Sequence, residues 1–177
     1  MKTRNIFMAI VSTIVLSACV APAVAPAPRL NLNDSQAVAG AISVHHDDFK
    51  KVTNYEGPNA SAEMGDSLFI RAWKADAIGS VNYQIYVRDY YDDDWRFYDS
   101  AYDSNGNSLD TTQISQDVGY CRAYSCTHYE HLGLNVTREY LERNQENGIR
   151  FKVSGKAGEE VFFIPSAYIK AFLSVAK

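Results

Sequence analysis

Apolar and polar residues alternate with a period of two along most of the chain beyond residue 49. The clearest run spans residues 81–88, where Val81, Tyr83, Ile85 and Val87 alternate with polar or amphipathic side chains. Because successive side chains of a β-strand point to opposite faces, this period predicts strands with one buried face. Similar runs cover residues 68–73, 95–97, 109–118, 127–136, 149–154 and 161–164. We therefore expect about eight strands, mostly in antiparallel hairpins.

A turn signal separates two of these runs. The sequence from Asp103 to Asn107 contains Asn105-Gly106. Asn-Gly tolerates positive φ at both central positions of a tight hairpin turn. The chain is therefore predicted to reverse between Tyr102 and Leu109.

Two helices are predicted in the last third of the chain. Thr137 is a candidate N-cap for a helix that ends near Gly148, because glycine favours the left-handed conformation at helix ends. Pro165 and Ser166 begin a C-terminal helix. Its apolar residues recur at helical spacing, at Tyr168, Ile169, Phe172, Leu173 and Ala176.

The segment from residue 34 to residue 49 has no clear period. Asp34 or Ser35 is placed to cap a short helix through Ile42. We detect no internal repeat, and residues 35–177 are interpreted as a single domain. The predicted fold class is mainly β (α+β), an antiparallel β-sandwich or a strongly curved sheet with two short helices as cover.

The first residues of the chain have the three-part layout of an export signal. Lys2 and Arg4 precede an apolar run over residues 6–16, and small residues follow it. A retained transmembrane helix is an alternative, because the uncharged stretch is long enough to span a bilayer. Prolines at positions 22, 26 and 28 interrupt its second half, which favours an export signal.

Leu16-Ser17-Ala18-Cys19 resembles the lipobox of bacterial lipoproteins. The resemblance implies cleavage after residue 18, a diacylglycerol thioether on Cys19 and an acylated amino terminus. Several acyl chains together anchor a protein stably. Residue 20 is valine, whereas aspartate there marks inner-membrane retention in the Gram-negative pattern. The resemblance therefore implies an outer-membrane anchor, with the domain facing the periplasm. An ordinary cleaved signal is the other alternative.

Residues 19–34 follow as a predicted tether. Alternating alanine and proline favour extended polyproline geometry and leave little to bury. At ~3.1 Å per residue, the fourteen residues 20–33 would reach roughly 40 Å from the membrane.

Charge argues against nucleic acid as a partner. The whole chain has 17 Lys+Arg, 21 Asp+Glu and a formal net charge of −4; without residues 1–18, which carry two cations and no acid, the charge becomes −6. Nucleic-acid-binding domains present basic surfaces instead. The 12 tyrosines and 8 phenylalanines favour pleated structure before they indicate any ligand.

Cys121 and Cys126 are predicted to form a disulfide, because an exported chain meets an oxidising compartment. The alternative is a zinc site with His128 and His131, which have suitable donor atoms. These histidines are three apart on a predicted strand, so they point to opposite faces, and the disulfide is favoured. No metal site and no cofactor is expected apart from the covalent lipid.

Two charged stretches are interpreted as solvated segments. His45-His46-Asp47-Asp48 offers metal-binding groups, but consecutive residues rarely converge on one ion, so a linker is expected. Tyr90-Tyr91-Asp92-Asp93-Asp94 lacks the alternating ligands and the glycine of calcium loops. We expect it to be a polar loop tip between two strands.

A tyrosine-rich surface is the main candidate for binding. Tyrosine and arginine contribute interface energy out of proportion to their number. We predict that four residues face solvent on adjacent strands: Tyr86, Arg88, Tyr98 and Tyr102. Tyr90 and Tyr91, in the predicted loop between these strands, complete the candidate set. The alternative is that these tyrosines simply pack across strands or under a helix.

No nucleophile elbow, zinc-protease helix or phosphate loop occurs in the sequence. The leading hypothesis is a non-enzymatic module that binds an envelope protein or polysaccharide through its sheet. The alternatives are an envelope hydrolase with a dispersed carboxylate or Ser/His site, and a metal-handling lipoprotein. A pocket lined by carboxylates with raised pKa values would favour the hydrolase, whereas an open surface would favour the binding module.

Overall fold

The computed structural model describes residues 29–92 and 94–177, which contain nine strands and three helices. The strands are β1 (Ser43–Asp47), β2 (Val52–Glu56), β3 (Ser67–Ala75), β4 (Val81–Asp92), β5 (Tyr98–Asp103), β6 (Ser108–Cys121), β7 (Cys126–Val136), β8 (Ile149–Gly155) and β9 (Glu159–Ile164). The helices are α1 (Ser35–Ala41), α2 (Arg138–Asn144) and α3 (Ser166–Val175). The predicted fold class is confirmed, with nine strands where about eight were expected. The helix α1 is the short helix that the capping signal at Asp34 or Ser35 predicts, in addition to the two helices predicted as cover.

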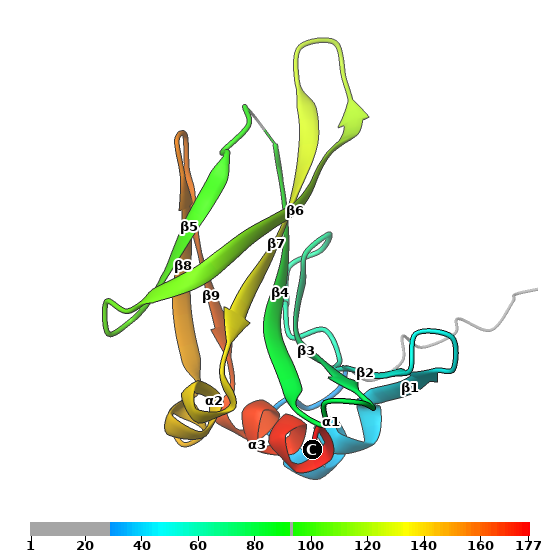
Figure 1. The fold of residues 1–177 in the computed structure, drawn as a ribbon. Coiled ribbons are helices and arrows are strands. Elements are labelled where there is room, and N and C mark those ends of the chain that lie inside the picture. Colours follow the sequence, from blue (N-terminus) through cyan, green and yellow to red (C-terminus); the bar gives the residue numbers. More distant parts are fainter. Residues whose placement is uncertain (1–28, 93) are drawn as a thin grey trace, which may run out of the picture.

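All nine strands belong to one open antiparallel sheet, in the order β1-β2-β3-β4-β7-β6-β5-β8-β9. Of the two predicted architectures, the structure therefore has the curved sheet and not the β-sandwich. The sheet bends so strongly that β8 and β9 face β3 and β4 across the core (Figure 1). The long strand β6 connects the two arms, because it pairs with β5 at its start and with β7 along the rest of its length.

Alternation along the central strands decides which side chains enter the core. On β4, Tyr83, Ile85 and Val87 are buried, as the period of two predicts. Leu132 and Leu134 of β7 lie beside them on the same inner face. The opposite arm contributes Ala101, Ile149, Phe151, Val153, Phe162 and Ile164 to the same core.

The helices gather at one end of the curved sheet (Figure 1). Asp34 caps α1 by accepting hydrogen bonds from the backbone N–H groups of Gln36 and Ala37. Thr137 caps α2, and Gly148, four residues beyond its end, has a φ of 79°. These caps agree with the sequence signals because capping depends only on residues within one turn.

Two tyrosine hydroxyls fix α3 to the sheet. Tyr168 donates to the carbonyl of Pro58 at 2.8 Å and accepts from the amide of Ile70 at 3.3 Å. Tyr83 donates to the carbonyl of Ala176 at 2.9 Å. A Cβ at Gly57 would lie 2.0 Å from the Tyr168 hydroxyl oxygen, so only glycine fits where this ring passes the backbone.

A buried carboxylate fixes the corner between β4 and β5. Glu130 of β7 is fully buried and accepts hydrogen bonds from the backbone N–H groups of Phe97 and Tyr98, both at 2.8 Å. The Tyr91 hydroxyl and the Gln116 amide also donate to it. Phe97 has a φ of 56°, which is uncommon for a non-glycine residue, so this corner depends on Glu130 to hold its conformation.

The structure corrects two expectations about charged stretches. His45, His46 and Asp47 are not in a linker but form most of β1, which pairs with β2 at one edge of the sheet. Tyr90 and Tyr91 are not in a loop tip, because β4 continues to Asp92. Pairing with the distant strand β7 extends β4 to Asp92, whereas β1 forms a hairpin with β2, the next strand in sequence.

Candidate functional site

The six residues of the predicted tyrosine surface do not form one surface. Tyr86, Arg88 and Tyr90 share the outer face of β4 and are partly exposed. Tyr91 and Tyr98 are only 6% and 1% exposed, so their prediction as surface residues is wrong. Tyr91 follows Tyr90 directly and therefore points to the opposite, inner face.

Tyr98 and Tyr102 lie on the other arm of the sheet. We predicted that β4 and β5 are adjacent because they follow one another in sequence. In the structure β7 and β6 lie between them, so Tyr102 is exposed far along the sheet from Tyr86.

A continuous set of rings, which we call the aromatic band, crosses the outer face of β3, β4 and β7. Its members, in order along the band, are Phe69, Tyr86, His131, Tyr129 and Tyr90. The distances between the centroids of successive rings are 4.7, 6.0, 6.5 and 4.9 Å. Cross-strand pairing builds the band, because Phe69 lies opposite Tyr86 and Tyr90 lies opposite Tyr129.

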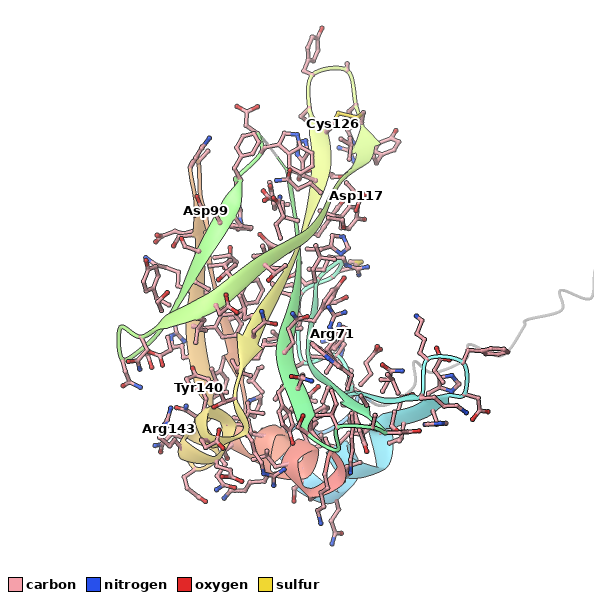
Figure 2. All side chains as sticks on the ribbon, viewed as in Figure 1. Arg71, Asp99, Asp117, Cys126, Tyr140 and Arg143 are labelled. Carbon is pink, nitrogen blue, oxygen red and sulfur yellow. A yellow bond between two sulfur atoms is a disulfide. The ribbon has the colours of Figure 1, made fainter. Side chains whose placement is uncertain are left out.

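Two guanidinium groups pack on the band. Arg71 lies 5.0 Å from the ring centroid of Tyr86, and Arg88 lies 5.5 Å from that of Tyr129. Such cation–π contacts order the arginine side chains before any partner arrives. Arg71 and Asp117 mark the two ends of this region in Figure 2.

A hydroxyl, an imidazole and a carboxylate follow one another beside the band. Tyr86 Oη lies 2.6 Å from His131 Nδ1, and His131 Nε2 lies 3.5 Å from the Asp117 carboxylate. Burial lowers the pKa of His131, and Asp117 opposes this shift. At neutral pH the ring is therefore mainly uncharged, which suits the short hydrogen bond to Tyr86.

A row of polar side chains borders the band along the sheet. Arg71 donates to Gln84 Oε1 at 2.9 Å, Gln84 donates to Asn135 at 2.7 Å, and Asn135 donates to Asp110 at 2.9 Å. The row crosses β3, β4, β7 and β6 in register. These groups satisfy one another, so the outer face is ordered without a covering helix.

Sequence reasoning missed Phe69, Arg71, Tyr129 and His131 as members of this surface. The alternation that places Phe69 and Arg71 on one face of their strand is visible in the sequence. The missing information was that β3 and β7 are the two neighbours of β4.

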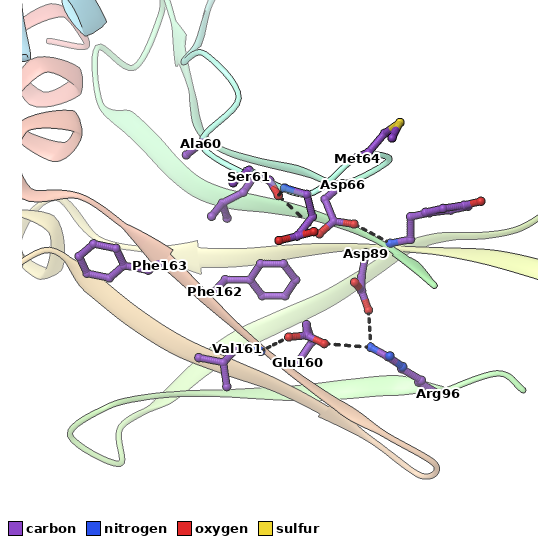
Figure 3. A pocket seen from close by; sticks show the side chains of 14 residues that line it. Ala60, Ser61, Met64, Asp66, Asp89, Arg96, Glu160, Val161, Phe162 and Phe163 are labelled. Carbon is purple, nitrogen blue, oxygen red and sulfur yellow. Dashed lines mark hydrogen bonds and ion pairs between the residues drawn. The ribbon is translucent and has the colours of Figure 1, made fainter. Parts of the chain in front are cut away.

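A second feature is an acidic cleft of about 520 Å³ between the two arms (Figure 3). Its walls are the loop over residues 60–66, the end of β4 and the strand β9. Four carboxylates and one guanidinium line it, from Glu63, Asp66, Asp89, Glu160 and Arg96. The excess of acids favours cationic groups or sugar hydroxyls over anions as occupants.

Arg96 joins three elements within the acidic cleft. Its Nη1 lies 2.9 Å from Asp89 Oδ2, 2.7 Å from the Tyr98 hydroxyl and 3.3 Å from Glu160 Oε2. Burial raises the pKa of Asp89, while the Tyr98 hydroxyl and Arg96 oppose that shift. Burial likewise raises the pKa of Asp66, whose Oδ1 accepts from the amide of Tyr90.

We expect Asp66 to make the stability of the protein depend on pH. Because its folded pKa lies above the unfolded value of 3.8, the folded state binds the proton more tightly. The free energy of unfolding then falls as pH rises from 3.8 through the raised pKa. Thermal melts of Asp66→Asn from pH 3 upward should show a smaller fall than the wild type.

The control for this experiment is Asp47→Asn. A hydrogen bond from the Lys50 amide lowers the pKa of Asp47, so its contribution to the pH dependence has the opposite sign. An unchanged pH profile in Asp66→Asn would contradict the assignment.

The predicted Cys121–Cys126 disulfide is present, with Cα atoms 4.0 Å apart across the β6–β7 hairpin. A bridge that closes so short a loop contributes about 2 kcal/mol in the chain-entropy description. His128 lies on the inner face and His131 on the outer face, as their spacing predicts. Within residues 29–92 and 94–177, no group of three or more His, Cys, Asp or Glu side chains is placed to hold a metal ion.

Cys19, the predicted signal over residues 1–18 and most of the tether lie outside the described residues. In the part of the chain that is described, no helix is long and apolar enough to cross a membrane. No known protein family, curated protein or solved structure matches the chain.

Proposed function

We propose that this protein is an outer-membrane-anchored lipoprotein whose folded domain binds another envelope protein without catalysis. The proposal rests on one observation above all, an ordered aromatic band with two stacked arginines on a sheet face that no helix of the described chain covers. Tyrosine and arginine dominate the energetics of protein interfaces. The lipobox at residues 16–19 supports the location.

The contacts within the aromatic band favour a protein over a polysaccharide. Phe69 and Arg71 already contact the ring of Tyr86, and Tyr90 and Arg88 contact the ring of Tyr129. Sugar stacking needs free ring faces, which these contacts reduce. Ring edges, hydroxyls and guanidinium groups remain, and these suit the mixed apolar and polar surface of a protein.

Photo-crosslinking in intact cells tests the binding surface. A photoreactive phenylalanine analogue in place of Tyr90 should form adducts with an envelope protein. The same analogue in place of Tyr102, an exposed tyrosine on the other arm, is the matched control. Equal adduct patterns at both positions, no adduct at Tyr90, or adducts only with glycan would contradict the proposal.

Once a partner is recovered, Tyr86→Ala should weaken its binding by about 2 kcal/mol, or roughly thirtyfold, as for central interface tyrosines. Tyr102→Ala should leave the affinity unchanged. Isothermal titration calorimetry measures both dissociation constants.

The membrane anchor has its own test. Cys19→Ala removes the thiol that would carry the lipid, so the protein should leave the membrane fraction after osmotic lysis and carbonate washing. Mass spectrometry of the wild-type amino terminus should find an acylated Cys19. An intact Met1 on the membrane-bound protein would overturn the proposed anchor.

The acidic cleft favours hydrolysis as a second candidate function. The raised pKa values of Asp66 and Asp89 are the specific observation, because a protonated carboxyl is able to act as a general acid. Release of soluble fragments from purified envelope polysaccharide, lost in both Asp66→Asn and Asp89→Asn, would establish this activity. No release by the wild type would leave the cleft with a structural role.

A further inference from the structure

The strand β9 ends the sheet, so one of its edges has no strand beside it in the described part of the chain. In the β8–β9 hairpin the amide of Gly155 donates to the carbonyl of Gly158 at 2.9 Å. Residues of antiparallel strands exchange hydrogen bonds at every second position, so Glu160 and every second residue after it bond to β8. The backbone groups of Val161 and Phe163 therefore point to the open edge.

This open edge forms one wall of the acidic cleft (Figure 3). Four consecutive residues of β9, from Glu160 to Phe163, line the cleft. Successive side chains of a strand point to opposite faces, so a cleft that contacts all four must lie along the edge of the strand. The opposite wall is the loop over residues 60–66. The acidic cleft is therefore a groove between a strand edge and a loop.

A side chain, and not a strand, satisfies the outward amide of Val161. This amide donates to Oε1 of Glu160 at 3.1 Å, and Oε2 of the same carboxylate lies 3.3 Å from Arg96 Nη1. The Glu160 side chain is 43% exposed, so it is able to move without opening the core. A peptide carbonyl could then replace it on the Val161 amide. The released carboxylate would be free to pair with a cation of the same peptide.

We propose that an extended, basic segment of a partner protein binds in the acidic cleft as an additional strand on β9. In such strand addition, main-chain hydrogen bonds give affinity and side chains at alternate positions give specificity. Four carboxylates against one guanidinium favour a positively charged segment. The cleft would be a second protein-binding site, and it does not depend on the aromatic band.

The acidic cleft also predicts the order of side chains in the bound segment. Glu160 and Phe162 point to the inner face of β9, so inward side chains of an added strand would lie beside them. A lysine or arginine beside Glu160 would also approach Asp89, whose carboxylate shares Arg96 Nη1 with Glu160. Two positions along the segment, an apolar side chain would lie beside Phe162.

Titration of the purified full-length protein with end-capped synthetic peptides tests the proposal. The probe is a short peptide with a lysine and a valine two positions apart and threonine elsewhere. It should bind, and hydrogen exchange followed by mass spectrometry should slow at Val161 and Phe163. The same peptide with glutamate in place of lysine should bind at least about tenfold more weakly.

Methylated peptides separate strand addition from simple charge attraction. Methylation of alternate amide nitrogens blocks one edge of the peptide and keeps its charge. Only one edge can face β9, so one of the two methylated forms should lose binding and the other should bind less affected.

Three variants of this chain test the contacts. Glu160→Gln should weaken binding of the lysine peptide by about tenfold, because the cation loses its carboxylate. Glu159→Gln is the matched control and should leave the affinity unchanged, because that carboxylate pairs with Lys152 on the outer face. Val161→Pro removes the outward amide and should abolish binding. Circular dichroism melts confirm that each variant is folded.

No binding of the lysine peptide, or equal binding of the lysine and glutamate peptides, would overturn the proposal. Equal binding of the unmethylated peptide and both methylated forms would also overturn it, because the attraction would then not involve the strand edge. Binding of an envelope oligosaccharide in the cleft, with no peptide bound, would assign the groove to sugars instead.

Discussion

Glu130→Ala is expected to lower the free energy of unfolding by about 3 kcal/mol or more, because several buried hydrogen-bond donors lose their common acceptor. The Glu130 carboxylate accepts hydrogen bonds from the amides of Phe97 and Tyr98, the Tyr91 hydroxyl and the Gln116 side chain. Alanine would leave these donors unpaired, and Tyr98 and Tyr91 are buried. The positive φ of Phe97 would lose its support as well.

Equilibrium denaturation in urea, followed by tryptophan fluorescence, measures this loss, because Trp95 lies in the same corner. Glu159→Ala is the matched control. Its carboxylate is exposed and pairs with Lys152 at 2.7 Å, so it should cost less than about 1 kcal/mol. Similar losses in the two variants would show that Glu130 does not hold the corner.

Phe172→Ala should lower the free energy of unfolding by about 3–5 kcal/mol, the usual cost of emptying a phenylalanine site in a core. Phe172 is fully buried on α3, and its ring lies 6.5 Å from that of Tyr83. The helix is fixed at both ends by the Tyr168 and Tyr83 hydroxyls, so the surroundings cannot easily collapse into the cavity. This variant tests the helical end of the core, whereas Glu130→Ala tests the opposite end.

Phe163→Ala on β9 is the control for this variant. Its side chain is 46% exposed, whereas its neighbour Phe162 is 6% exposed. We expect Phe163→Ala to cost much less than Phe172→Ala, because nearly half of the removed surface already contacts water. Equal melting temperatures for Phe172→Ala and Phe163→Ala would contradict the assignment of Phe172 to the core.

Local signals predicted the elements of this fold well. The period of two located six of the nine strands, and Asn105-Gly106 marked the β5–β6 hairpin. The run predicted over residues 95–97 ends just before β5 and is not a strand. Caps at Asp34 and Thr137 marked helix starts. The strands β1 and β2 were missed, because they are short and contain no fully buried residue, so that apolar and polar positions do not alternate along them.

The candidate binding surface was predicted only in part. Tyr86, Arg88 and Tyr90 were assigned to one surface, and they do share the outer face of β4. Tyr98 and Tyr102 were added because β5 follows β4 in the chain. The acidic cleft was not predicted at all, because its carboxylates come from segments up to 97 residues apart, from Glu63 to Glu160.

The sequence by itself determined most of the strands, where the helices begin, and that Cys121 and Cys126 form a bridge. These features depend on backbone sterics, capping and cysteine chemistry among residues close together in the chain. Only the tertiary structure decided that β7 and β6 separate β4 from β5. That order follows from burying both arms against one core, and it determines which tyrosines face solvent and which carboxylates share a cleft.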